Sequence, residues 1–230
     1  LAAQSDRPAD ARGVSLRPLN RRIEPDALHY THVSVAIDRA RRVATFTVRA
    51  PQGAQPTDLA GIEAAGDAWY PLALGRELDD AILSMRTNEL SIGTWLIKTE
   101  GEAAAVLAMD AVLQAHASHW LVRETIGLLR RTLARLDVSS RSLFALIEPG
   151  SCFAGTFLEL ALACDRSYQL ALPDEPERAP SLVVHEANFG RYPMVTGQSR
   201  LARRFYDEKP ALDAARACMG QPLDADAAFA

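Results

Sequence analysis

The chain has 230 residues, of which 48% are hydrophobic and 23% are charged, and its formal net charge is −4. This length and composition are typical of a globular domain that buries a hydrophobic core of its own. Acidic and basic residues are mixed along the chain, which argues against a nucleic-acid partner and against attraction to an anionic membrane.

The N-terminal part of the chain predicts an arm, a hairpin and a loop. Residues 1–30 are rich in Pro, Arg and Asp without periodicity, and they are expected to form a connecting arm. "HVSVAIDRARRVATFTVRAP" alternates apolar and polar residues on both sides of "DRAR", which predicts a β-hairpin with strands near 32–38 and 42–49. The region from Pro51 to Pro71 is expected to be an inserted loop.

The middle of the chain predicts alternating helices and strands. Apolar residues at helical spacing predict a helix of about three turns that ends near Asn88; they are Leu74, Leu78, Ala81, Ile82 and Met85. "LSIGTWLIKT" follows as a buried strand, and residues 119–136 have the pattern of an amphipathic helix. "RSLFALIEPG" is a buried strand that Pro149 and Gly150 stop.

After that turn, a helix is expected from about Gly155, then a strand at "DRSYQLAL" and a last third that is mainly helical. The succession of hairpin, helix and strand predicts an α/β domain of repeated β-β-α units over residues 31–230.

The helix after Gly155 contains the first candidate functional residue. Between Phe157 and Cys164 every residue is apolar except Glu159. A buried carboxylate without a partner costs several kcal/mol or takes up a proton. Either Glu159 pairs with an arginine, for which Arg166, Arg191 and Arg200 are the candidates, or it works on a ligand bound at the helix N-terminus, where free N–H groups favour anions.

"VVHEANFGRYP" supplies a second acid, Glu186, placed between a strand-like run and a turn. Two carboxylates that converge on one cavity can act as acid and base, whereas the alternative is that Glu186 lies on a surface loop. His185 is a further acid–base candidate, and Cys152 in the turn is either a nucleophile or a small buried residue. Motifs of nucleotide kinases, zinc proteases and serine hydrolases are missing.

These residues carry a family resemblance. "ALIEPGSCFAGTFLELALACDRSYQL" followed by "HEANFGRYPMVTGQSRLARRF" resembles the central signature of the crotonase (enoyl-CoA hydratase/isomerase) superfamily. The run "ELALACD" from Glu159 matches the helix that follows the family's Gly-rich turn. Glu186, Gly190 and Pro193 match its Glu-x-x-x-Gly-x-x-Pro segment, and "GEAAAVLAMD" has the length and ending of its first oxyanion-hole segment.

The resemblance implies a crotonase-like fold and the roles of four residues. Backbone N–H groups near Val106 and Gly155 are expected to hold the thioester carbonyl oxygen of an acyl-CoA. Glu159 and Glu186 are expected to be the paired acid and base. A coenzyme A thioester is then the substrate, and no metal or redox cofactor is implied.

Over nearly its whole length the chain resembles, more specifically, the C-terminal crotonase-like half of the benzoyl-CoA-dihydrodiol lyase family. The stretches that carry this resemblance are "DDAILSMRTNEL", "RETIGLLRRTLARLDVSSRSLFALIEPGSCFAGTFLELALA" and "YPMVTGQSRLARRFYDE". Enzymes of that family convert 2,3-epoxybenzoyl-CoA and water into 3,4-didehydroadipyl-CoA semialdehyde and formate. The implied partners are an N-terminal crotonase-like half in the same chain and further copies in a homo-oligomer.

Two departures from the superfamily pattern crowd the place of the thioester. The turn "EPGSCFAGTF" begins with Glu148 and Pro149, has Gly155 alone where the family has a run of glycines, and has one residue more between Gly150 and Glu159. The first oxyanion segment has Leu107 and Ala108 where small residues are expected. Three readings follow: a half that takes part in the lyase chemistry, a degenerate half that supports the active one or the dimer, and a generic enoyl-CoA hydratase.

The sequence also gives an expected location. Cys152, Cys164 and Cys218 are too few and too scattered for a disulfide framework or a metal site, which favours the reducing cytoplasm. No run approaches the roughly 20 apolar residues of a membrane span, and the N-terminus does not have the pattern of an export signal. The first residue is Leu1 and the last helix has no clear stop, so we expect part of a longer polypeptide.

Overall fold

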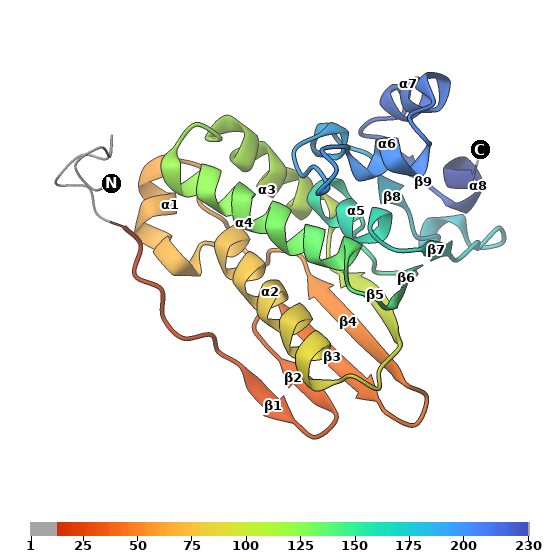
Figure 1. The fold of residues 1–230 in the computed structure, drawn as a ribbon. Helices are drawn as coiled ribbons and strands as arrows, with labels where there is room; N and C mark the ends of the chain where they lie inside the picture. The colour runs from red at the N-terminus through yellow and green to blue at the C-terminus, as the bar shows by residue number, and fades with distance from the viewer. Residues whose placement is uncertain (1–12, 230) are drawn as a thin grey trace.

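The computed structural model describes residues 13–229. At its centre is a seven-stranded sheet in which the strands lie side by side in chain order, from β1 to β7 (Figure 1). Strands β1 to β4 pair antiparallel, and β4 to β7 pair parallel. The strands are β1 (Arg22–Glu24), β2 (Ala27–His29), β3 (Val33–Asp38), β4 (Val43–Arg49), β5 (Thr94–Glu100), β6 (Ser142–Ile147) and β7 (Arg166–Gln169). The predicted α/β class is confirmed.

Eight α-helices and a small second sheet complete the described part of the chain. The helices are α1 (Leu59–Ala65), α2 (Tyr70–Asn88), α3 (Ala103–Ala115), α4 (Trp120–Asp137), α5 (Gly155–Leu162), α6 (Arg200–Arg204), α7 (Lys209–Ala217) and α8 (Ala225–Phe229). Single turns of 3-10 helix are η2 (Gly66–Ala68), η3 (Pro176–Arg178) and η4 (Glu186–Phe189). Strands β8 (Leu182–Val183) and β9 (Pro222–Leu223) pair antiparallel.

The predicted hairpin is confirmed as β3 and β4, and its register follows from the alternation of its residues. Val33 pairs with Val48, Val35 with Phe46 and Ile37 with Ala44, so the buried apolar residues of both strands share one face of the sheet. In the turn the Asp38 carboxylate accepts a hydrogen bond from the Arg41 N–H at 2.9 Å. This side chain holds the tight connection.

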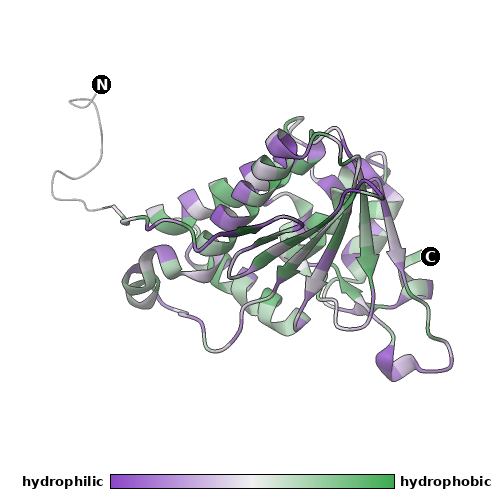
Figure 2. Cartoon of the chain, turned by 90° about the horizontal axis from the view of Figure 1, so that it is seen from below, coloured by the Kyte–Doolittle hydropathy of each residue, from purple (hydrophilic) through white to green (hydrophobic). Residues whose placement is uncertain are grey.

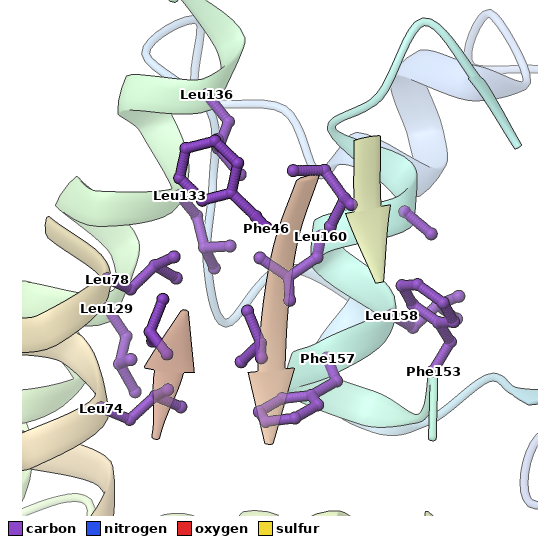
Figure 3. Close-up of a cluster of buried hydrophobic side chains, with 14 of the residues drawn as sticks. Phe46, Leu74, Leu78, Leu129, Leu133, Leu136, Phe153, Phe157, Leu158 and Leu160 are labelled. Atoms are coloured by element: carbon purple, nitrogen blue, oxygen red, sulfur yellow. The ribbon is translucent and has the colours of Figure 1, made fainter. Parts of the chain in front are cut away.

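Helices α2 and α4 run side by side across the sheet (Figure 1). Their apolar stripes meet each other and the inner side of the strands, as the predicted amphipathic pattern requires. In Figure 2 the central strands are mostly green, which marks hydrophobic residues, while the helices change between green and purple, which marks hydrophilic ones. The residues labelled in this core in Figure 3 are Phe46, Leu74, Leu78, Leu129, Leu133, Leu136, Phe153, Phe157, Leu158 and Leu160.

Helix α5 is apolar on all sides and lies in the interior. Every residue from Gly155 to Ala161 is buried, Glu159 included. A helix of this composition is stable only when other elements surround it. The sheet lies on one side of α5, while α3, η4 and α6 pack around the rest.

Two expectations about the first third of the chain were wrong. Strands β1 and β2 belong to the sheet, which therefore begins inside the segment expected to be a connecting arm; residues 1–12 of that segment lie outside the described residues. Strands of three residues are too short to show a period of two. The expected loop between Pro51 and Pro71 contains α1, which Asp58 caps by accepting from the Gly61 N–H at 2.7 Å.

A further helix, α3, was not expected, because the resemblance matched "GEAAAVLAMD" only to an oxyanion-hole segment. Across residues 13–229, none of the helices combines the length and the apolar character needed to cross a bilayer.

Candidate functional site

The contact between α3 and α5 brings Asp110 of α3 to Gly155, one of the predicted oxyanion-hole residues. Val106 and Asp110 lie one turn apart on the buried side of α3, and this side faces the first turn of α5. The Asp110 carboxylate reaches the start of α5, where its Oδ2 accepts a hydrogen bond from the Thr156 N–H at 2.8 Å. An anion therefore occupies the N-terminus of α5, and the chain itself supplies it.

Gly155 makes this contact possible. A Cβ at this position would lie 2.0 Å from Asp110 Oδ2, a distance that no side chain tolerates, and the backbone has a φ of +45°. The glycine that the family resemblance assigned to a ligand carbonyl thus makes room for an internal carboxylate. The Val106 N–H is also engaged, since it donates to the Glu102 carbonyl at 3.4 Å within α3.

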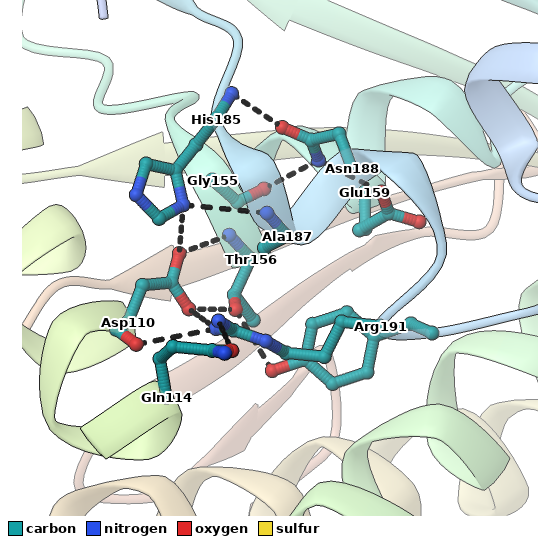
Figure 4. Close-up of polar contacts among 10 residues, drawn as sticks. Asp110, Gln114, Gly155, Thr156, Glu159, His185, Ala187, Asn188 and Arg191 are labelled. Atoms are coloured by element: carbon teal, nitrogen blue, oxygen red, sulfur yellow. Dashed lines mark hydrogen bonds and ion pairs between the residues drawn. The ribbon is translucent and has the colours of Figure 1, made fainter.

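Asp110 is fully buried and is surrounded by donors (Figure 4). Arg191 Nη1 donates to its Oδ1 at 3.0 Å, and the Thr156 hydroxyl donates to the same oxygen. The Tyr192 hydroxyl lies 2.9 Å from the Thr156 hydroxyl and extends the network. Burial raises the pKa of Asp110, while Thr156 and Arg191 oppose the rise.

Glu159 is held by two partners on different segments. Asn188 Nδ2 donates to its Oε1 at 2.7 Å, and Arg200 Nη1 donates to its Oε2 at 2.9 Å. Only 1% of Glu159 is exposed. Burial raises the pKa of Glu159 to about 7, against the opposing effects of Arg200 and Asn188. The structure has the arginine pairing that was the alternative to a catalytic role, with Arg200 as the partner of Glu159, whereas Arg191 binds Asp110.

Arg200 serves a second carboxylate as well. Its Nε and Nη2 donate to the two oxygens of Asp137 at 2.9 and 2.8 Å, and its Nη1 also donates to the Tyr192 carbonyl at 2.9 Å. Its side chain is 1% exposed. One guanidinium therefore links the end of α4 to the middle of α5 from the start of α6.

Glu186 has a different environment from Glu159. It is the first residue of η4 and is exposed, and no hydrogen bond or ion pair joins it to another described residue. The same short helix directs Asn188, two residues later, onto Glu159. The structure thus brings Asn188, rather than Glu186, to the buried carboxylate.

The two alternative candidates have structural roles. Cys152 is fully buried, and burial raises the pKa of its thiol to about 11, so the reactive thiolate is not favoured. The His185 ring caps η4 by accepting from the Ala187 N–H at 3.4 Å, and its Nδ1 lies 3.9 Å from Asp110 Oδ2.

A cavity of about 210 Å³ lies on another face of α3. None of the four predicted site residues lines it. Its walls are mainly apolar and come from three segments: Pro51, Gly53, Gln55, Pro56, Thr57, Trp69, Tyr70, Pro71, Ala105, Ala108, Met109 and Val112. The cavity is therefore not formed by the predicted acid–base and oxyanion residues.

Sequence reasoning missed most of the residues that surround the predicted site. Asp110, Thr156 and Asn188 gave no signal, because their roles depend on partners that are 29 to 81 residues away in the chain. The strict requirement for glycine at residue 155 is the one local sign of the Asp110 contact.

Comparison with known proteins finds one relative in sequence and several in fold. No family model matches the sequence. Over 223 residues, or 97% of this chain, the sequence is 53% identical to benzoyl-CoA-dihydrodiol lyase from Aromatoleum evansii, and the chain spans 40% of that relative's length.

The fold is similar to those of enoyl-CoA hydratases in crystal structures. For the enzyme from Geobacillus kaustophilus the TM-score is 0.52 at 16% identity, with 88% of this chain and 66% of that chain covered. For the enzyme from Bacillus halodurans it is 0.51 at 16% identity, with 86% and 70% covered. The chain therefore has the fold of the enoyl-CoA hydratases, and nearly its whole length is similar in sequence to one part of benzoyl-CoA-dihydrodiol lyase.

Proposed function

We propose that this chain is a supporting portion of a ring-opening lyase that converts 2,3-epoxybenzoyl-CoA and water to 3,4-didehydroadipyl-CoA semialdehyde and formate. The 53% identity to benzoyl-CoA-dihydrodiol lyase supports the reaction. Because the chain spans 40% of that relative, the acyl-CoA substrate and the chemistry are assigned to the complete protein, with a second crotonase-like half as the partner. Homo-oligomeric assembly and a cytoplasmic location stay predictions.

The observation that carries the supporting role is the environment of Glu159. A general acid or base must come within hydrogen-bonding distance of the proton that it transfers. Both oxygens of Glu159 are bound to Asn188 and Arg200, and the residue is 1% exposed. The carboxylate is thus used to join α5 to the segments that cover it.

The N-terminus of α5 supports the same proposal. A thioester oxygen that approached Thr156 N–H would have to displace the Asp110 carboxylate, which is charge-paired with Arg191. A neutral carbonyl oxygen is a weaker acceptor than a carboxylate at such a site. The internal ligand is therefore the stronger competitor.

One observation favours the second candidate, a catalytic role for this portion. A carboxylate with a pKa of about 7, as burial gives Glu159, suits proton transfer near neutral pH. We rank this role second because Glu159 is buried and does not line the apolar cavity. A generic enoyl-CoA hydratase is third, since that likeness is one of fold alone.

The test is the exchange of Glu159→Gln and of Glu186→Gln in the intact lyase. With a supporting role, kcat for ring opening is unchanged in both variants when it is measured well below the unfolding temperature. Thermal unfolding separates the two sites, because only the buried Glu159 contributes to packing. Glu186→Gln, at an exposed position, is the matched control.

A loss of about 10²–10⁴-fold in kcat with Glu159→Gln, the size typical of a removed acid–base group, would overturn the supporting role. The same loss with Glu186→Gln would show that its exposed carboxylate reaches a substrate held elsewhere in the complete protein.

A further inference from the structure

The large sheet has two faces with opposite burial. On β3 to β6 every inward residue is buried, from Val33 on β3 to Ile147 on β6, under the helices of the core. On the other face, here called the outer face, no residue of these strands is buried. Parallel sheets are almost always covered on both sides. The parallel part of this sheet, β4 to β7, is covered on one side only within the described residues.

Apolar side chains gather at one end of the outer face. They come from β5, β6 and β7, which are neighbours at the end of the sheet (Figure 1). Leu96 is opposite Phe144, and Leu146 is opposite Tyr168. We call this group the outer-face patch, and it consists of Leu96, Phe144, Leu146, Tyr168 and Leu170.

The patch is ordered but open. The rings of Phe144 and Tyr168 meet edge to face, with 5.9 Å between their centroids. Even so, 54% of Tyr168 and 47% of Leu170 is exposed. Contiguous exposed apolar groups on a folded protein typically mark a surface where another protein or domain packs.

The rest of the outer face is polar, and its charges on β4 and β5 are paired, whereas the exposed Arg166 of β7, opposite Phe144, has no ion pair with another described residue. Threonines on β4 and β5 lie between ion pairs, with Lys98 paired to Glu148 and Arg49 paired to Glu100 at 3.1 Å. Charges that are already paired can be covered at lower cost than isolated ones. A mixed surface of this kind is typical of contacts between domains of one chain, whereas homodimer interfaces are more apolar.

These features point to one occupant. We infer that the outer-face patch is the surface on which the remaining part of the lyase chain packs, as a second domain beside the uncovered parallel strands. The part matched by this chain is 40% of the relative, so 60% of that protein lies outside the match and is available to cover it. This inference rests on the proposed function, because it takes the complete lyase as the native setting.

Hydroxyl-radical footprinting tests the contact with matched probes. Tyr168 in the patch and Tyr206 outside it are 54% and 79% exposed. Oxidation of both is measured in the intact lyase and in the 230-residue chain alone. We expect the rate for Tyr168 to fall several-fold in the intact protein while the rate for Tyr206 stays the same.

Equal rates for Tyr168 in both samples would overturn the inference. So would protection of Tyr168 that appears in the isolated chain and rises with its concentration, because a second copy would then be the occupant. Tyr192, which is 1% exposed, reports whether the isolated chain is folded. If the isolated chain is not folded, the test uses the intact protein only, in which Tyr168 must be oxidised far more slowly than Tyr206.

A variant and its control test whether another part of the protein covers the outer-face patch. In the intact lyase, Leu170→Asp should raise the oxidation of Tyr168, whereas Tyr206→Asp should not; equal oxidation of Tyr168 in both variants would contradict the contact. The footprint does not depend on turnover. If Glu159→Gln loses ring opening while Tyr168 stays protected, the supporting role is overturned and the proposed interface is retained. If Glu159→Gln keeps ring opening while Tyr168 is not protected, the interface is overturned and the supporting role is retained.

Discussion

Arg200 satisfies two buried carboxylates with one positive charge. Glu159 and Asp137 share it, so the cluster has an excess negative charge whenever both carboxylates are ionised. Burial raises the pKa of both acids because Arg200 offsets only part of the cost of removing them from water. The guanidinium is thus the group on which this part of the interior depends.

Arg200→Met should therefore destabilise the fold strongly. Removal of one partner from a buried ion pair typically costs 3–5 kcal/mol, and here it leaves two carboxylates without a cation. Urea unfolding at pH 7 measures the change. Arg203→Met, an exposed arginine one turn along α6, is the control and should leave the free energy of unfolding nearly unchanged. Similar midpoints for the two variants would contradict the role given to Arg200.

At the scale of elements, the pairing of α3 with α5 depends on one glycine. Asp110 can reach the first turn of α5 only because residue 155 has no Cβ. Both Gly155 and Gly150 have a positive φ, of +45° and +87°, but nothing lies within 4 Å of a Cβ built at Gly150. The two positions therefore separate backbone strain from collision.

Gly150→Ala should cost about 1 kcal/mol, because a positive φ is unfavourable for alanine. Gly155→Ala should cost about 2–4 kcal/mol, since collision with the carboxylate adds the penalty of overpacking. Chemical denaturation measures both values. The double change Gly155→Ala with Asp110→Ala should be non-additive. Equal losses for the two single glycine variants would show that Asp110 moves aside freely.

Local patterns in the sequence predicted the elements that are long or strongly periodic. The β3–β4 hairpin, β5, α4 and β6 lie where alternation or helical spacing placed them, and α2 ends at Asn88 as expected. Strands β1 and β2 and helix α1 were missed, because each is too short to show its period or is masked by nearby prolines. Helix α3 was missed although it is 13 residues long, because its run of apolar residues does not show a clear polar face.

The site was predictable in part. The anomaly at Glu159 was visible from composition, and an arginine was a named alternative. The choice of Arg200 as the partner of Glu159 depends on a contact between residues 41 positions apart. The occupation of the start of α5 by Asp110 depends on a contact between residues 46 positions apart. Such contacts follow from the packing of whole elements, which no local pattern contains.

For the whole molecule, the buried acids set a pH dependence. Burial raises the pKa of Glu159 to about 7, from 4.5, and also raises that of Asp110 and Asp137. Between pH 4.5 and about pH 7 the folded chain holds a proton at Glu159 that the unfolded chain has lost. The contribution to stability is therefore complete below pH 4.5 and disappears as the pH rises through about 7.

We expect thermal unfolding curves to show this slope and Glu159→Gln to reduce it, by up to about 1.4 kcal/mol for each pH unit. Burial lowers the pKa of His32, which acts in the opposite direction, but His32 is present in both proteins and cancels in their difference. Parallel pH profiles for the parent and the variant would contradict the buried, proton-binding state of Glu159.

The strand order of the sheet has a consequence for how the protein is made. Each strand pairs with the next one along the chain, so the sheet can grow strand by strand as the nascent polypeptide leaves the ribosome. Helix α5 is the exception, because Arg200 is synthesised 41 residues after Glu159. Until that arginine emerges, the carboxylate must stay hydrated or take up a proton. The docking of α6 is therefore the step that allows the interior to close.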